Sequence, residues 1–358
     1  MLRAATRLLA AATLLAAAAA RPCLAQGSVA IETNVLFYGD NTEFRNPFRE
    51  GETIFGAAVR LGAAADIGDR TTLTLGVFAN QRFGSDDAFD LVRPVVTLTV
   101  RGRRSSFTFG TLPPAPHTAA HGPDLVGPHA LLPPLQRETL AFDRPYEAGL
   151  QWLFSGARLR HDVWLNWQQL NTPGHRERFD AGATGELTLG GPFALPFQLH
   201  IVHEGGQLFA AGPVADSIAA ATGLAVRGSP GTLDAASVEM FALGSRFVPD
   251  RSAAGADLNG AGFLARAAAE RRGWRGHLLV WRGKAFIKDE GDPNYQSFRR
   301  DGTRYRGTRD YSELGLTRIF RPSPGVTVHA SARFHRTEKH YEYSYRVLAV
   351  VGAAWKVK

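Results

Sequence analysis

Cysteine is almost absent from the sequence, since Cys23 is the only one among 358 residues. Long apolar runs are also missing: beyond residue 25 no stretch of 18 or more apolar residues occurs, which excludes a membrane-spanning helix there. No repeat of fixed length appears, which argues against a propeller or a solenoid. No linker rich in Ser, Gly or Pro divides the chain. These absences favour a single domain.

The N-terminal segment has the three parts of a secretory signal peptide: a basic start, the apolar run Leu8–Ala20 and small residues near a cleavage site after Ala25. A membrane anchor is the alternative, but the run is short for a hydrocarbon layer of about 30 Å. Lipid attachment at Cys23 is disfavoured, because small residues do not precede it. We predict a signal peptide at 1–25 and one domain at 26–358, without disulfide or thiol chemistry.

The rest of the sequence repeats segments that are apolar at every second residue. In Arg158–Gln168 the apolar row is Leu159, Val163, Leu165 and Trp167, and polar residues fill most other positions. A period of two is typical of a β-strand with one apolar face. Segments of about ten to thirteen residues are long for a soluble β-sandwich, which is the alternative, but suit tilted spanning strands. The pattern predicts an all-β fold, a transmembrane antiparallel up-and-down β-barrel.

The number of strands follows from parity. Both termini of a single-chain barrel normally lie on the periplasmic side, so the number is even. Counting forward to Glu204 and backward from Lys358 leaves one strand missing, and the mostly apolar stretch Ser217–Arg227 supplies it. We therefore predict about 16 strands, with 14 and 18 as alternatives. Long outer loops are expected at about 112–144, 205–216 and 289–310.

The last segment carries a resemblance. Gly352, Trp355 and Val357 resemble the C-terminal signal by which the barrel-assembly machinery recognises outer-membrane barrels, although Lys358 stands where many porins have phenylalanine. At the level of architecture, the whole chain resembles porin-like barrels of Gram-negative bacteria. The resemblance implies a place in the cell outer membrane, reached by export. It implies as partners the outer-membrane lipid and lipopolysaccharide, the assembly machinery during insertion, and small solutes.

The rows between the apolar residues are strongly charged. A charged lumen requires water, because unpaired buried charge is costly. The net charge is +8 and the pI about 9.9, so we predict a weakly anion-selective pore for small polar solutes. Arginines paired with carboxylates across strands are the alternative. The predicted pore-lining residues are Arg60, Arg93, Arg101, Arg158, Arg160, Asp162, Arg178, Glu186, Glu239, Arg282, Lys284, Glu313, Arg333 and Arg346.

The longest loop, at 112–144, is the third outer loop in this count. In general porins the third outer loop folds inward and narrows the pore, and the resemblance in position suggests the same role here. An ordinary surface loop is the alternative. Its three histidines, His117, His121 and His129, could bind zinc or copper, but no regular element fixes their spacing. We predict no metal and no cofactor.

Two other classes of function stay open. One is a plugged or narrow barrel that binds or exports a lipid or polysaccharide. The other is a hydrolase at the rim, for which His161 with Asp162 or His203 with Glu204 are candidates. No Gly-x-Ser-x-Gly motif supplies a nucleophile, so we predict that the chain is not an enzyme. The Arg- and aromatic-rich loop Asp289–Asp310 suits lipopolysaccharide phosphates or acidic sugars better than nucleic acid.

Overall fold

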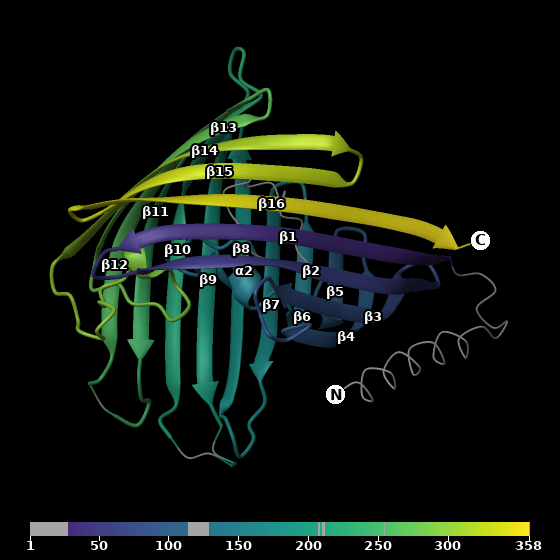
Figure 1. Cartoon of the computed structure of the whole chain (residues 1–358), viewed down its shortest axis with the longest axis horizontal. Helices are drawn as coiled ribbons and strands as arrows, with labels where there is room; N and C mark the ends of the chain where they lie inside the picture. The colour runs from purple at the N-terminus through teal and green to yellow at the C-terminus, as the bar shows by residue number, and fades with distance from the viewer. Residues whose placement is uncertain (1–27, 114–128, 207, 210–211, 254, 358) are drawn as a thin grey trace.

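The chain forms one closed barrel. The computed structural model describes residues 28–113, 129–206, 208–209, 212–253 and 255–357. In this part sixteen antiparallel strands pair in sequence order, and β1 closes the barrel on β16 (Figure 1). The predicted fold class and strand number are confirmed. The strands are β1 (Val29–Arg45), β2 (Glu50–Ile67), β3 (Thr71–Arg82), β4 (Leu91–Arg101), β5 (Ser105–Thr111), β6 (Ala148–Ser155), β7 (Leu159–Gln169), β8 (Glu177–Gly190), β9 (Phe193–Gly205), β10 (Ala215–Gly228), β11 (Ala235–Val248), β12 (Leu258–Arg271), β13 (Trp274–Lys284), β14 (Thr308–Ser323), β15 (Val326–Thr337) and β16 (His340–Val357).

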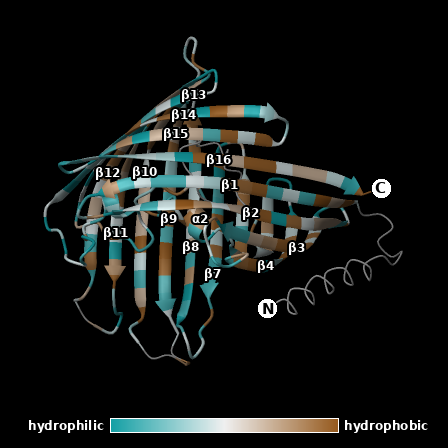
Figure 2. Ribbon diagram, viewed as in Figure 1, coloured by the Kyte–Doolittle hydropathy of each residue, from teal (hydrophilic) through white to brown (hydrophobic). Residues whose placement is uncertain are grey.

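Alternation along the strands produces the two faces of the wall, and Figure 2 shows hydrophobic and hydrophilic residues alternating along them. On β4, Val92, Val96 and Val100 are exposed, whereas Val95 and Thr97 on the opposite row are buried. Because lipid offers no hydrogen bonds, an outward row must be apolar and the backbone must pair fully. The predicted apolar outer face is therefore present. No helix within the described ranges has both the length and the apolar character needed to cross a membrane.

The prediction of the sixteenth strand depended on the even strand number rather than on a clear sequence pattern. The structure places β10 where Ser217–Arg227 was predicted, and β10 pairs continuously with β11 from Asp216 to Gly228. Its inward row is mostly alanine, including Ala219 and Ala221, which blurs the contrast between its faces. The even strand number therefore predicted β10 better than the alternation of its residues did.

The connections divide the barrel into two ends. At one end the turns are short, as at 68–70 and 324–325, where Gly68 and Gly325 take positive φ. At the other end lie the connections at 112–147 and 285–307. In outer-membrane barrels the longer loops face outward and the short turns face the periplasm. We call the long-loop end the outer end.

Two connections from the outer end fold into the lumen. The first contains α2 (Leu140–Asp143) and the second contains η2 (Pro293–Tyr295). Their side chains pack on inward residues of the wall and form an apolar interior in the outer half of the barrel. The fully or almost fully buried members from the two connections are Leu131, Leu132, Leu135, Leu140, Phe142, Phe286, Ile287 and Tyr295. The inward course predicted for the first loop is confirmed for residues 129–147, but the lumen there is packed rather than filled with water.

Candidate functional site

A band of polar side chains lines the inner wall of β13–β16 and β1 near the outer end. The register pairs Glu313 with His335, Arg333 with Ser344, and Arg346 with Asp40. Side chains of one row are about 5 Å from those on the next strand, so they can bond across the sheet. Alternation and register alone therefore gather these groups at one height of the barrel.

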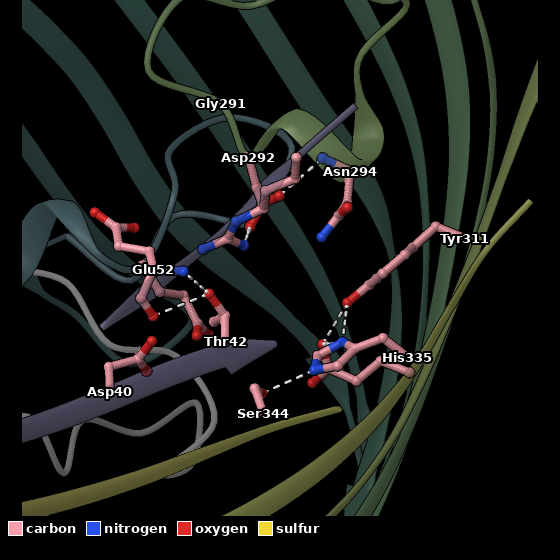
Figure 3. A network of polar contacts seen from close by, with 12 residues as sticks. Asp40, Thr42, Glu52, Gly291, Asp292, Asn294, Tyr311, His335 and Ser344 are labelled. Carbon is pink, nitrogen blue, oxygen red and sulfur yellow. Dashed lines mark hydrogen bonds and ion pairs between the residues drawn. The ribbon is translucent and has the colours of Figure 1, made fainter. Parts of the chain in front are cut away.

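Within this band four side chains form a continuous hydrogen-bonded chain, of which Figure 3 labels Ser344, His335 and Tyr311. Ser344 Oγ lies 2.8 Å from His335 Nε2, and His335 Nδ1 lies 2.7 Å from the hydroxyl of Tyr311. That hydroxyl donates to Glu313 Oε2 at 2.7 Å. His277 Nε2 holds the other carboxylate oxygen at 2.8 Å. All of these residues are buried.

The hydrogen bonds determine the tautomer of His335. Glu313 is an acceptor, so Tyr311 donates its proton to it and accepts from Nδ1–H of His335. In the neutral imidazole this assignment leaves Nε2 without a proton and facing the hydroxyl of Ser344. A serine bonded to a histidine that is oriented by a third group is the arrangement of a nucleophile with its general base. His335 Nδ1 also lies 3.4 Å from Glu313 Oε2, so the carboxylate acts on the imidazole directly as well.

Two arginines place positive charge beside Ser344. Arg333 stands directly opposite Ser344 in the register, and Arg346 follows Ser344 on the same inward row. Both donate to Glu138 Oε2 of the first inward connection, at 2.8 Å and 2.7 Å. Among the residues that the structure describes, Nε of Arg333 is buried without a hydrogen-bond partner. A free buried donor next to a nucleophile is suited to an oxygen that becomes negative during a reaction.

The chain of hydrogen bonds lines a cavity of about 50 Å³. Its outer side is covered by Arg49, Asp292 and Tyr295, and Arg49 forms an ion pair with Asp292. Burial raises the pKa of the Tyr295 hydroxyl well above its ordinary value, so this residue covers the cavity as a neutral phenol. The cavity holds no more than a few waters, and a larger ligand must displace the inward connections.

Most of the residues predicted to line a pore lie on the inward rows. Several of the arginines form ion pairs with carboxylates, which was the alternative to an anion-selective lumen. Arg160 lies 3.2 Å from Glu186, and Arg178 lies 3.0 Å from Glu290. Arg60 donates to the carbonyl of Leu112 at the start of the first inward connection, Arg101 donates to Thr72 of the wall, and Arg93 stands opposite Phe78. The remaining inward members are Asp162, Glu239, Glu313, Arg333 and Arg346. Passage of solutes along them stays a prediction.

Three residues that were predicted to line the pore lie elsewhere in the structure. Arg158 lies in a short turn, before the first residue of β7. Arg282 and Lys284 lie on the outward row of β13, together with Val280, rather than in the lumen. The sequence misleads here because β13 is apolar on both faces: Leu279 and Trp281 point inward, against the packed connections. Apolar residues on both faces remove the contrast on which the prediction of facing depends.

The histidines considered for a hydrolase or a metal have other roles. His161 packs on Phe154, whereas His203 bonds to Asp216 at 2.8 Å rather than to Glu204. His129 is held by Asp162 at 2.7 Å and Glu147 at 3.2 Å, so both ring nitrogens are engaged. His117 and His121 lie outside the described residues, as does the predicted leader.

His129 gives a pH-dependent prediction. Burial alone would lower the pKa of His129, but Glu147 and Asp162 raise it from 6.5 to about 10. The folded state therefore binds the proton more tightly than the unfolded state, and this stability is fully present below pH 6.5 and lost as pH rises toward 10. We expect the midpoint of urea unfolding to fall across that range, and to fall less in His129→Gln. The exposed His340→Gln is the control and should keep the pH dependence of the wild type. If the urea midpoint of His129→Gln fell as steeply with pH as that of the wild type, the role given to His129 would be contradicted.

A sequence profile of the family described as "Lipid A 3'-O-deacylase-type" matches residues 19–358. The chain belongs to this family. No curated protein sequence matches this family member. Among solved structures, the barrel is similar to a loop-deletion mutant of OmpT, an outer membrane protein of Vibrio cholerae, with 8% identity, a TM-score of 0.57 and coverage of 92% of this chain and 99% of that one. OmpT expressed in the outer membrane of the same organism gives 10% identity, a TM-score of 0.55 and coverage of 91% and 98%.

The comparisons support the predicted outer-membrane, porin-like architecture of this deacylase-type barrel. They also correct one prediction. The family is named for an enzyme, so the prediction that the chain is not an enzyme was wrong. That prediction depended on the lack of a Gly-x-Ser-x-Gly motif. Such a motif belongs to a strand-to-helix turn of another fold, whereas a barrel brings a nucleophile and a base together from neighbouring strands.

Sequence reasoning named Glu313, Arg333 and Arg346 but missed Tyr311, His335 and Ser344. A usable signal existed. Near their outer ends, three consecutive strands carry polar pairs two residues apart, which alternation places on one inward row. Counting outward from the tight turns would have aligned them. The pairs are Tyr311 with Glu313, Arg333 with His335, and Ser344 with Arg346.

Proposed function

We propose that this barrel hydrolyses an acyl ester of lipid A in the outer leaflet, with Ser344 as the nucleophile and His335 as the general base. The observation that carries the proposal is the hydrogen bond between Ser344 Oγ and His335 Nε2, with the imidazole oriented by Tyr311 and Glu313. Membership of a deacylase-type family supports the reaction class and the 3′-O-linked ester. The position near the outer end supports a substrate in the outer leaflet.

The proposed reaction has two steps, acylation of Ser344 and hydrolysis of the acyl-serine. Ser344 Oγ attacks the ester carbonyl while His335 Nε2 takes its proton, and the developing oxyanion accepts from Arg333. The proton then passes from His335 to the leaving sugar oxygen as the ester bond breaks, which leaves an acyl-serine. Water, deprotonated by His335, hydrolyses the acyl-serine to a free fatty acid and restores the hydroxyl. No step requires an oxidant, a reductant or a further reactant.

The packed lumen favours this function over free passage of solutes. Leu132, Phe142 and Phe286 are fully buried inside the barrel, and burying each contributes about 2 kcal/mol relative to an exposed position. The inward connections are therefore part of the folded barrel, and the one with Asp292 and Tyr295 must move aside before lipid A reaches Ser344. Of the functions considered from the sequence, the lipid-binding barrel and the hydrolase fit a filled barrel, and the open pore fits it poorly.

Turnover of lipid A by the purified barrel tests the proposal. Folded barrel in vesicles that contain lipid A with an intact 3′-O-acyl chain is expected to yield lipid A lighter by that chain, and the free fatty acid. Mass spectrometry of the extracted lipids measures both products. Lipid A of unchanged mass, with folding verified by electrophoretic mobility before and after heating, would show the proposal to be wrong.

A further inference from the structure

Cations with few carboxylate partners lie on the outer wall near the site. Arg282 and Lys284 follow Val280 on the outward row of β13, and Arg336 follows Phe334 on the outward row of β15. These residues occupy the outer ends of their strands, where the wall meets the outer-leaflet headgroups. The side chain of Arg282 is 72% exposed. Directly toward the periplasm the same rows are apolar and exposed, as at Leu278 and Phe334.

Few carboxylates neutralise this group. Asp310 is the one ion-pair partner of Arg282, at 3.6 Å, and Lys284 and Arg336 have no ion pair with any residue that the structure describes. Two arginines nearby, Arg246 on the outward row of β11 and Arg251 in the connection from β11 to β12, differ. Arg246 is paired with Asp257, and Arg251 is paired with Asp216. Lys284 and Arg336 thus lie in the sector of β13–β15 without a carboxylate partner among the described residues.

Cations above an apolar wall fit a ligand with the complementary order, which is anionic groups at the headgroup level and acyl chains below. Lipid A has this order, since its phosphates are attached to the sugars that carry its acyl chains. In the register Arg282 is opposite Asp310 and Arg336 is opposite Ser312, so the two arginines flank β14 on strands that are roughly 10 Å apart across the sheet. Guanidinium groups bind phosphate by paired hydrogen bonds.

We propose that Arg282, Lys284 and Arg336 form a docking surface for the phosphate groups of lipid A. The surface lies next to the proposed catalytic residues, because Arg336 and His335 are neighbours on β15 and point to opposite faces of the wall. Lipid held there has its ester-bearing sugars beside the rim over which they must pass to reach Ser344. This inference rests on the proposed substrate, but docking can be measured without turnover.

Binding of lipid A to Ser344→Ala barrel tests the docking surface, because that variant does not consume the lipid. We expect Arg282→Gln/Arg336→Gln in this background to bind lipid A about tenfold or more weakly, since each interfacial cation contributes to attraction of an anionic lipid. The matched control is Arg246→Gln/Arg251→Gln, which removes the same charge from paired arginines and should bind within about twofold of the parent. Native mass spectrometry across a lipid A titration measures the affinities.

Two further lipids complete the test. Lipid A from which both phosphates have been removed should bind the parent weakly and should not discriminate between the two double variants. Equal binding of lipid A by the parent and by Arg282→Gln/Arg336→Gln would overturn the proposal. So would phosphatidylglycerol binding as tightly as lipid A, because the surface would then be a general site for anionic lipid. Docking as expected, without lipid A hydrolysis by the wild-type barrel, would refute the proposed function alone.

If the double variant does not fold, the salt dependence of lipid A binding to the parent decides the question. Exposed charge pairs are screened by salt, so affinity should fall as the salt concentration rises. Affinity that is independent of salt would refute docking through phosphates.

Discussion

Replacing Ser344 with alanine is expected to lower lipid A deacylation by about three orders of magnitude or more, because removal of a nucleophile eliminates the covalent step. His335→Gln should cause a loss of similar size, since the two residues act as one unit and their effects do not add. Ser344→Ala removes only one hydroxyl, and His335→Gln keeps a polar side chain in the cavity, so both variants of the barrel should fold. Release of fatty acid, followed in single-turnover reactions, measures the effect.

The orienting residues give graded losses that a merely structural role would not produce. Tyr311→Phe removes the hydroxyl between His335 and Glu313, but the carboxylate remains 3.4 Å from Nδ1, so a moderate loss is expected. Glu313→Gln removes the negative charge that stabilises an imidazolium, so its loss should be greater, and the fall in rate should depend on pH. Equal and pH-independent losses would favour a structural role.

Ser331→Ala is the matched control. Ser331 lies on the same inward wall, and its hydroxyl bonds to Thr317 at 3.0 Å rather than to a histidine. Its removal should leave deacylation within about twofold of wild type. Activity of Ser344→Ala equal to that of Ser331→Ala would show that Ser344 is not the nucleophile.

Removing residues 131–143 is expected to convert a silent barrel into a conducting one. This deletion takes Leu132, Leu135 and Phe142 out of the lumen and leaves the pairing of β5 with β6 unchanged. A closure of sixteen strands leaves more space than inward side chains alone can fill. We expect wild-type barrel in planar bilayers to give no steady conductance, and the deletion variant to give long-lived openings.

We also expect the channel of the deletion variant to be selective for anions. It removes Glu138, the carboxylate shared by Arg333 and Arg346, and leaves Arg333 with Glu313 at 3.6 Å and Arg346 with Asp40, so the positive charge of the opened lumen rises. An excess of fixed positive charge favours anions, which reversal potentials in a salt gradient would report. Deleting the exposed residues 84–88, between β3 and β4, is the control and should leave the barrel silent. Steady conductance of the wild type would instead support the solute pore considered from the sequence.

The candidate site could be predicted only in part. Charged residues on alternating rows are visible in the sequence, and Glu313, Arg333 and Arg346 were recognised in this way. Ser344 and His335 are nine residues apart in the chain and touch only because the turn at 338–339 sets the register of β15 on β16. A shift of one residue would turn one of the two rows to the lipid face. No local motif carries that information.

The sequence by itself determined the class of fold. A period of two, the length of the segments and an even strand number specify a closed membrane barrel, because lipid tolerates neither polar outward rows nor unpaired strand edges. Tertiary structure decided what fills the barrel. Leu279 and Trp281 are as apolar as Leu278 and Val280, and only the inward connections show which pair faces the core. Burial against a distant segment is not a local property of the chain, so neither the packed lumen nor the pairing of Ser344 with His335 could be derived from one strand at a time.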